Sequence, residues 1–348
     1  MVTPSMTRSL GRLTVTTYDD PDDLTSTGWD ELVRMTGAPV FYESAYLKAY
    51  HEHPLGQIER FGYLVVTERK AELPAAVLPV ALHTQADPLG NLRGVEPRIE
   101  GAPALLSHVW HCYDTQIVGA VHRPEVAAAM LAALQDLARQ WGVRWIGLIN
   151  VERHSATASA LAATGLTARH LTDRFSADLT GLTDLDGYLR RLGVRPRANL
   201  TRCARRAAES GITTTAAPAA ETNLEEVAEL CGRTAARFGN ADYYPVSAFA
   251  AFVTGLGKLA HVLAVRQRGR LVAAGVCLAD ERRFHTWACG VDYNVTGNAS
   301  PYALLFAQSV ALAIELGSVV IEGGRSNAVF KTRHGMSVRP LDAYLSRL

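Results

Sequence analysis

The sequence predicts an α+β protein made of two copies of one α+β unit, one after the other. Three observations lead to this prediction. The chain has 348 residues, which is more than one ordinary hydrophobic core accommodates. Strand-like and helix-like segments alternate along it. Each half also gives paired strands, a loop, a long helix and further strands in the same order, although the residues differ.

These patterns place the boundaries of the two units. We expect residues 1–11 to be a loose leader, residues 12–182 to be the first unit and residues 183–348 to be the second. The second unit begins with a basic helical segment over residues 184–210.

Composition limits the classes of function. The net charge of +1 gives no global attraction to nucleic acid or acidic membranes, so such a contact requires a local patch. The start has no basic and apolar signal-peptide pattern, and no apolar run is long enough to span a bilayer. Five scattered cysteines without a Cys-x-x-Cys pair argue against a zinc ribbon or a disulfide framework. We expect a cytoplasmic protein with no metal and no membrane contact, in which Cys277 and Cys289 are core residues.

In the first half, alternating or buried apolar runs predict strands over residues 13–18, 60–67, 73–83, 143–150 and 175–179. Helices are predicted over residues 29–35, after residue 44, over 124–140 and over 156–164. Residues 124–140 give the clearest helix, with Pro124 at its start and Gly142 at its exit. The Pro/Gly-rich residues 87–103 predict a long loop that is either mobile or lines a site.

The segment from His108 to Asp114 reads His-x-x-His-x-x-Asp. Three metal-capable side chains on one helical face are one interpretation, but the spacing matches no established zinc site. Histidines beside aromatic residues more often belong to a hydrogen-bonded core or a pocket wall. We therefore expect Tyr42, His108 and His111 to line a substrate pocket.

The most basic stretch, residues 188–206, lies between the halves. A helix that starts near Pro196 brings Arg202 and Arg206 to one side, and Arg205 can pair with Glu209. Two interpretations stay open: a solvated surface helix, or contacts with the phosphates of a nucleotide-type donor or a nucleic acid. On the second, the donor-binding residues are Arg195, Arg197, Arg202 and Arg206.

A helix over residues 224–236 is followed by a polar and aromatic loop. This loop contains Arg237, Asp242, Tyr243 and Tyr244, with a turn favoured at Gly239. The loop predicts either a substrate-binding surface or simple helix–helix packing.

The C-terminal region, residues 284–348, carries the main candidate site. A strand over residues 284–291 leads through a loop to a helix that Ser300 caps and that ends before Gly317. Loop amides, here those of Thr296, Gly297 and Asn298, and the helix N-terminus can bind phosphate. After a short strand over residues 319–321 come the polar side chains Glu322, Arg325, Asn327, Lys331 and His334, and then an alternating strand with Leu341, Ala343 and Leu345 on one face.

Several of these segments resemble the Fem-like branch of the Gcn5-related N-acyltransferase (GNAT) superfamily. The resemblance rests on the duplicated unit, the arginine-rich helix, residues 39–44 (PVFYES), Ser300-Pro301-Tyr302, and residues 330–335 (FKTRHG). It implies two tandem GNAT-like domains, each with a mixed sheet that splays open at its centre. It also implies acyl transfer from a thioester or an aminoacyl-tRNA to an amine, with Lys331 stabilising negative charge near the reacting ester.

Acyl transfer needs a proton acceptor and a group that stabilises the oxyanion. Candidates for proton handling are Asp292, Glu322, His285 and Tyr293, and candidates for charge stabilisation are Lys331, Arg325 and the loop amides. Arg237, Asp242, Tyr243 and Tyr244 are expected to form the acceptor pocket, with Asn327 nearby.

The donor is expected to be aminoacyl-tRNA or acyl-CoA, with no tightly bound cofactor. Acyl-CoA-using members carry a pyrophosphate loop with two small residues and a basic one, whereas residues 294–300 have the single glycine Gly297. This departure resembles the tRNA-using transferases and favours aminoacyl-tRNA, with a small amine or hydroxylamine as the acceptor. The alternatives are an acyl-CoA-dependent N-acetyltransferase and a non-catalytic protein that binds RNA or a nucleotide through the arginine helix.

Overall fold

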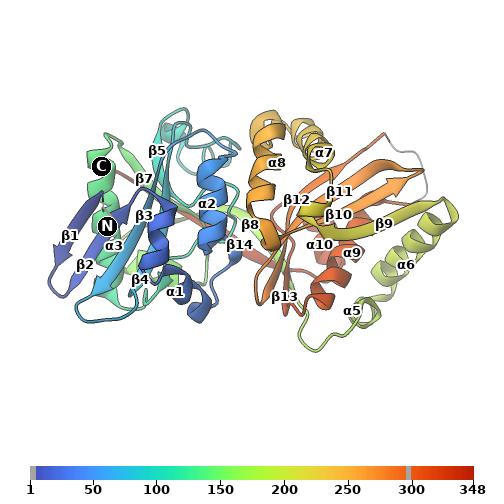
Figure 1. Ribbon diagram of the computed structural model, residues 1–348, viewed down its shortest axis with the longest axis horizontal. Coiled ribbons are helices and arrows are strands. Elements are labelled where there is room, and N and C mark those ends of the chain that lie inside the picture. The colour runs from blue at the N-terminus through green and yellow to red at the C-terminus, as the bar shows by residue number, and fades with distance from the viewer. Residues whose placement is uncertain (1–4, 295–298) are drawn as a thin grey trace. The chain divides into compact units, whose positions relative to one another are not determined.

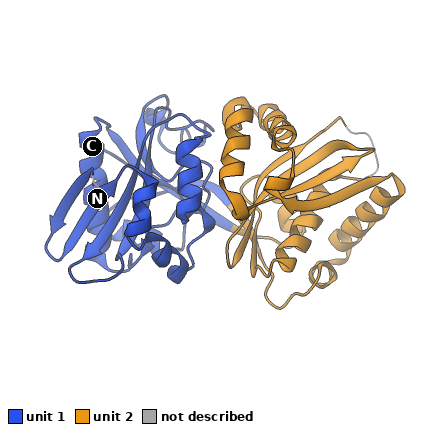
Figure 2. Ribbon diagram, viewed as in Figure 1, with its two compact units in different colours: residues 1–173, 339–348 blue, residues 174–338 orange. Residues whose placement is uncertain are grey.

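The computed structural model describes residues 5–294 and 299–348. The chain forms two compact units, shown in Figure 2: unit 1 contains residues 1–173 and 339–348, and unit 2 contains residues 174–338. The expected division at residues 182 and 183 therefore differs from the observed one. The difference arises because the last strand, β14 (Ser337–Arg347), pairs with a strand of unit 1.

Unit 1 has a mixed, mostly antiparallel sheet in the order β1-β2-β3-β4-β5-β7-β14 (Figure 1). Its strands are β1 (Met6–Leu10), β2 (Leu13–Tyr18), β3 (Ile58–Glu68), β4 (Ala76–His83), β5 (Ala104–Ser107) and β7 (Trp145–Glu152), and the short β6 (Val118–Gly119) pairs with β4. Residues 6–10, expected in a loose leader, are a paired edge strand instead. The parallel pair is β5 with β7, which are joined through a helix.

The helices of unit 1 are α1 (Trp29–Thr36), α2 (Ser44–Glu52), α3 (Pro124–Gln140) and α4 (Ala156–Ala163). Apolar residues of α3 and α4 share one core with β2, β3, β4 and β7. Tyr344 of β14 joins this core because the strand has a bulge between Asp342 and Tyr344. The bulge breaks the alternation expected for Leu341, Ala343 and Leu345.

Unit 2 has a second mixed sheet, in the order β8-β13-β12-β11-β10-β9. Its strands are β8 (Ala168–Asp178, which begins in unit 1), β9 (Ile212–Pro218), β10 (Ala260–Gln267), β11 (Arg270–Ala279), β12 (Arg283–Val291) and β13 (Val320–Glu322). Its helices are α5 (Leu185–Arg191), α6 (Val194–Glu209), α7 (Leu224–Arg237), α8 (Val246–Gly255), α9 (Pro301–Glu315) and α10 (Ala328–Arg333). The predicted α+β class, with two similar units in tandem, is confirmed.

The sheet of unit 2 opens between β12 and β13. The two strands run parallel and pair only at Arg283–His285 with Val320–Glu322, whereas β12 continues to Val291. Beyond Glu322 the chain turns back along β8, where the N–H of Gly323 donates to the carbonyl of Phe175 at 2.7 Å. A Cβ on Gly323 would lie 2.5 Å from the Sδ of Met336, so a larger residue there would have to displace the Met336 side chain. The end of β12 is left free of β13, and α10, a helix not predicted from the sequence, follows this turn.

Among the described residues, no helix has both the length and the apolar character needed to cross a membrane.

Candidate active site

Lys331 is the central charged residue of unit 2. It lies on α10 and is only 5% exposed. Its Nζ donates to the carbonyl of Arg325 at 3.3 Å and lies 5.3 Å from the centre of the Phe175 ring. No carboxylate pairs with it in the described part of the chain. Burial lowers the pKa of Lys331 from 10.5 to about 7, so its ammonium group titrates near neutral pH.

Cys289 of β12 lies close enough to Lys331 for the two groups to interact electrostatically. Burial raises the pKa of Cys289 to about 12, and the Lys331 ammonium opposes that rise. The sequence predicts Cys289 as a core residue, but it is only partly buried, whereas Cys277 is buried as expected. The reason is the divergence of β12 from β13, which leaves this end of β12 without a neighbouring strand on one side.

Two of the predicted acceptor residues adjoin this position. The guanidinium of Arg325 donates to the hydroxyl of Tyr243 at 3.0 Å. The rings of Tyr243 and Tyr244 contact each other with centroids 4.8 Å apart, and Tyr244 packs against Phe249 and Trp287. Lys331, Arg325 and Tyr243 therefore form one connected chain of polar contacts, which links α10 to the loop between α7 and α8.

Arg237 and Tyr293 form a separate contact at the end of β12. The guanidinium of Arg237 lies 4.6 Å from the centre of the Tyr293 ring. Burial raises the pKa of Tyr293, Cys289 adds to the rise, and Arg237 opposes it. The interaction with Cys289 places Tyr293 beside the Lys331 region.

Glu322 and His285 lie on the opposite face of the sheet from Lys331. His285, Glu322 and Ser176 are register partners in neighbouring strands, so their side chains point to one face. Phe175, whose ring contacts Lys331, points to the other face because it neighbours Ser176 along β8. The Glu322 carboxylate is 4% exposed and lies 3.5 Å from Arg174.

His285 is fully buried, with its Nε2 3.4 Å from the Oδ2 of Asp280. Burial of Asp280 opposes its ionisation, yet hydrogen bonds from His285 and from the N–H groups of Arg282 and Arg283 bring its pKa below the ordinary value. His285 pairs with Glu322 at the last register position before β12 and β13 diverge, but on the face opposite Lys331.

Three other predicted residues serve local structure. The Asp292 carboxylate pairs with Arg270 at 2.5 Å and accepts the N–H of Asn294 at 2.9 Å. Asn327 precedes α10 in a left-handed conformation and bonds through its side chain to Tyr302. Asp242 is exposed at the surface of the loop before α8.

The predicted phosphate-binding residues lie on α6. Arg195, Arg197 and Arg202 are exposed and Arg206 is half-buried, while Leu200, Cys203 and Ala207 face the core. The Cys203 Sγ accepts the N–H of Ser300 at 3.2 Å, which fixes α6 beside the N-terminus of α9. Arg202 and Arg206 both lie near Cys203 and oppose the rise that burial gives its pKa. Thr296, Gly297 and Asn298 lie outside the described residues.

Tyr42, His108 and His111 lie in unit 1. His108 donates from Nε2 to the carbonyl of Phe41 at 3.0 Å and accepts the N–H of Val109, and burial lowers its pKa to about 4. His111 bonds to the hydroxyl of Tyr50 at 2.8 Å. The Tyr42 hydroxyl donates to the carbonyl of Gln116 at 2.9 Å.

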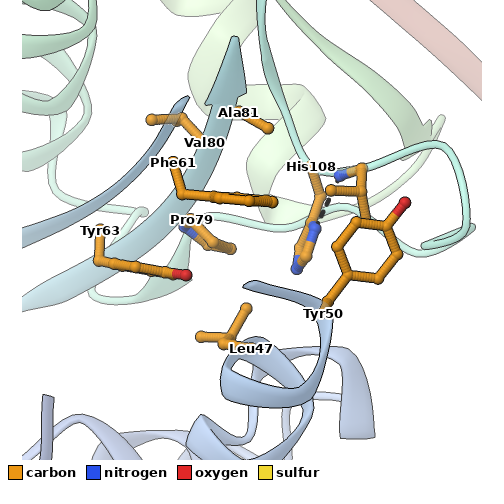
Figure 3. A pocket seen from close by; sticks show the side chains of 9 residues that line it. Leu47, Tyr50, Phe61, Tyr63, Pro79, Val80, Ala81 and His108 are labelled. Carbon is orange, nitrogen blue, oxygen red and sulfur yellow. Dashed lines mark hydrogen bonds between the residues drawn. The ribbon is translucent and has the colours of Figure 1, made fainter. Parts of the chain in front are cut away.

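The structure does place His108 at the wall of a cavity, which Figure 3 shows between α2, β3 and β4. The cavity measures about 10 Å³, which is room for about one water molecule. Its lining is mostly apolar and aromatic, with Leu47, Tyr50, Phe61, Tyr63, Pro79, Val80, Ala81 and Val109 completing it. In the described ranges, no group of three or more His, Cys, Asp or Glu residues is placed to hold a metal ion.

Sequence reasoning missed several residues around Lys331 and Glu322. Phe175 and Tyr302 are apolar or aromatic residues in ordinary strand and helix patterns, and Arg174 is an isolated arginine in a strand. Only the pairing of β8 with β13 and the packing of α10 bring them to this place. For Cys289, the sequence did offer one signal of a place near the site, namely its position close to the end of β12.

Part of the chain that includes this site is similar to a known protein family. Residues 195–332 match the acetyltransferase (GNAT) domain family. The matched region contains most of α6, the opening between β12 and β13, and Lys331. No curated protein sequence matches the chain.

Solved structures extend the GNAT likeness to the whole chain. The structure of FemX has a TM-score of 0.63 at 11% identity and covers 91% of this chain and 95% of that one. A tandem GNAT protein from the clavulanic acid biosynthesis pathway has a TM-score of 0.58 at 12% identity and covers 96% and 98%. L-PGS from Bacillus licheniformis has a TM-score of 0.56 at 14% identity and covers 94% and 92%. At such identities the likeness is one of fold, and it confirms the predicted resemblance to the Fem-like tandem GNAT branch.

Proposed function

We propose that the chain is an acyltransferase that moves an aminoacyl group from aminoacyl-tRNA to the amine, hydroxylamine or similar group of a small molecule. The reaction takes place in unit 2, where β12 and β13 diverge. One observation carries the proposal: the buried Lys331 ammonium lies at this divergence with a backbone carbonyl and an aromatic ring as its contacts. A buried cation without a carboxylate partner is costly unless a ligand supplies negative charge.

In this reaction the acceptor nitrogen attacks the ester carbonyl carbon, and its lone pair forms the new C–N bond. The carbonyl electrons move onto oxygen, and the Lys331 ammonium stabilises that oxyanion in a site largely shielded from water. The nitrogen gives up a proton, which we assign to the Glu322 carboxylate. The bond between the carbonyl carbon and the ribose oxygen then breaks, that oxygen takes up the proton from Glu322, and the tRNA leaves with its 3′-terminal hydroxyl restored. Glu322 ends the paired part of β13, so a substrate held in the opening can contact Lys331 from one face and Glu322 from the other.

The α6 helix supports a polyanionic donor. Arg195 and Arg206 are eleven residues apart, which is about 16 Å along a helix. One strand of duplex nucleic acid carries a phosphate about every 3.4 Å of axis. The distance between Arg195 and Arg206 therefore matches the length of several successive phosphates better than that of a single diphosphate. Arg195, Arg197 and Arg202 are exposed, and none of the described carboxylates pairs with them. The adjoining N-terminus of α9 adds a favourable field for phosphate.

Acyl-CoA is the second candidate donor. It is favoured by the family match, which is to an acetyltransferase domain. On this alternative the same Lys331 stabilises the oxyanion of a thioester, and the leaving group is a thiol.

The test offers charged tRNA and acyl-CoA separately to the purified protein, with a panel of amines and hydroxylamines, and detects products by mass spectrometry. We expect product with charged tRNA, loss of about 100- to 1,000-fold in rate in Lys331→Met, and an unchanged rate in the matched control Arg333→Met, which removes an exposed charge from the same helix. If product forms with acyl-CoA and not with charged tRNA, acyl-CoA is the donor instead of aminoacyl-tRNA. Salt-sensitive tRNA binding without product from either donor would indicate a binding protein and overturn the enzymatic proposal.

A further inference from the structure

Two aromatic rings of unit 2 are exposed and touch each other. Phe238 is 66% exposed and Tyr293 is 50% exposed, and no other Phe, Tyr or Trp within residues 5–294 and 299–348 is exposed to a comparable degree. Their centroids are 6.3 Å apart with the planes nearly perpendicular. A single exposed apolar residue needs no explanation, but an adjoining pair of rings beside a candidate active site indicates a binding surface.

Arg237 completes this surface, which we call the aromatic platform (Arg237, Phe238 and Tyr293). The central carbon of its guanidinium lies 4.6 Å from the centre of the Tyr293 ring, which is a cation–π contact. The residue is exposed, and its N–H groups donate to no acceptor in the part of the chain that the structure describes. The Arg237 guanidinium can therefore stack on Tyr293 and donate hydrogen bonds to a phosphate oxygen of a ligand. The neighbouring Phe238 can stack on a flat ring of the same ligand.

The platform is held rigidly at the end of β12. The Thr234 hydroxyl donates to the carbonyl of Val291 and accepts the Val291 N–H at 2.8 Å, which fixes the last turn of α7 to the strand. The backbone of α7 also packs directly on Gly290, where a Cβ would lie 2.8 Å from the carbonyl oxygen of Leu230. This close packing places Phe238 beside Tyr293, and Tyr293 precedes Ser300, the cap of α9, by only seven positions in the sequence.

We infer that the aromatic platform binds a nucleotide of the acyl donor, with the base stacked on Phe238 and a phosphate held by Arg237. The inference rests on the proposed function, because it assigns the platform to that donor. A nucleobase fits the observations because stacking requires a flat ring and an accessible aromatic face, and the arginine supplies charge for the attached phosphate. The exposed arginines of α6 also favour binding of an anionic chain. Two rings and one arginine offer too little apolar surface for a membrane.

An aminoacyl-tRNA and an acyl-CoA both contain such a nucleotide. The binding experiment therefore uses two probes, uncharged tRNA and adenosine 3′,5′-bisphosphate, each titrated into the full-length protein by fluorescence anisotropy or calorimetry. The variants are Phe238→Ser, Phe238→Trp and Arg237→Gln. Leu316→Ser is the matched control, because Leu316 is an exposed apolar residue at the C-terminal end of α9 in the same unit.

We expect Phe238→Ser to weaken binding of at least one probe about 10-fold and Phe238→Trp to preserve it, since a larger ring still stacks. Arg237→Gln should weaken binding by a similar factor and lower the slope of log affinity against log salt by about one. Leu316→Ser should bind as the wild type does. The probe that responds identifies the source of the nucleotide, and a response of either one supports the platform.

Wild-type affinity in Phe238→Ser for both probes would overturn the inference, and so would a wild-type protein that binds neither probe. Turnover separates this failure from failure of the proposed function. If Phe238→Ser keeps wild-type affinity for both probes and turns over charged tRNA like the wild type, the platform is wrong and the transferase stands. If no acyl group is transferred but Phe238→Ser still loses nucleotide binding, the platform stands and the catalytic proposal fails.

Discussion

The two units follow one plan and differ at its centre. In both, a helix connects a parallel pair of strands, β5 with β7 in unit 1 and β12 with β13 in unit 2. In unit 1 the chain after Ser107 folds into residues 108–116, which are largely buried and bond back to β7. In unit 2 the corresponding strand runs on to Val291 without β13, and Lys331 lies beside it.

Contacts of residues 108–116 show how unit 1 is closed. The N–H of Thr115 donates to the carbonyl of Asn150 at 3.0 Å, and the Asn150 side chain donates to the carbonyl of Cys112 at 2.9 Å. The helix that follows the second parallel strand is α4 in unit 1 and α10 in unit 2. Helix α4 contains no ionisable residue, whereas α10 contains Lys331 and Arg333. The comparison teaches that the same plan gives a filled centre in one copy and leaves a buried charge beside an opening in the sheet in the other.

The largest expected effect comes from a substitution that removes a ring from the filled centre of unit 1. Phe41 is fully buried and contacts Tyr46 and Tyr113 edge to face at 5.4 and 5.1 Å. Phe41→Ala should lower the free energy of unfolding by roughly 3–5 kcal/mol, because it leaves a cavity. Denaturant unfolding measures this, with the exposed Met35→Ala as the control. If the change instead lowered turnover of the folded protein and left stability unchanged, unit 1 would be more than a packed support.

The next effect is on chemistry in unit 2. Glu322→Gln should lower kcat about 100-fold or more, because the amide accepts no proton from the acceptor. The amide keeps the shape of the side chain but not its charge beside the buried Arg174, so the stability of the variant is measured as well and kcat is compared where the variant is folded. Steady-state kinetics with a saturating acceptor measures the change, and a Glu322→Gln variant with unchanged kcat would remove this residue from the reaction.

A smaller effect concerns the cost of burying Lys331. Its pKa is lowered on folding, so the unfolded chain binds the proton more tightly and the stability of the protein rises as the pH rises from about 7 toward 10.5. Lys331→Met removes this cost and should raise the free energy of unfolding by roughly 1–4 kcal/mol at neutral pH and below. The difference from the wild type should shrink at higher pH. Melting curves at pH 6 and pH 9 test this, and an equal difference at both would contradict it.

The smallest expected effect is at the start of α9. The Ser300 hydroxyl accepts the N–H of Ala303 at 3.3 Å, whereas Arg123, the corresponding residue of α3 in unit 1, makes no side-chain cap. Ser300→Ala should cost about 1 kcal/mol of stability. Chemical denaturation gives the value, and a cost near zero would show that the Cys203 contact alone holds this end of the helix.

The sequence allowed most helices and strands to be predicted where local signals were strong. Ser300-Pro301 and Gly317 mark α9, and Pro124 marks α3, because capping and proline geometry act within one turn. The six-residue α10 was missed, since it begins after the left-handed Asn327 and depends on packing against α9. Local pattern also cannot distinguish a filled centre from an open one, because that difference arises from contacts between distant segments.

The same reason explains the outcome for the candidate site. The polar segment after β13 contains Lys331 and Arg325, and the structure brings the Lys331 ammonium to the Arg325 carbonyl. His108 does line a small cavity, and the hydrogen bonds of His108 and His111 are made with Phe41, Val109 and Tyr50 inside unit 1. Whether a polar residue faces a ligand or a carbonyl of its own chain is decided by tertiary packing.

The pH dependence of kcat/KM, measured for the wild type and for Lys331→Arg, tests the central claim most directly. The pKa of Lys331 is about 7, so a role as a cation predicts that wild-type activity falls as the pH rises above 7. Lys331→Arg keeps its charge, so its residual activity should not fall over that range. A wild-type profile that rises through pH 7, or the same alkaline fall in Lys331→Arg, would contradict the assignment of Lys331 as the group that stabilises the oxyanion.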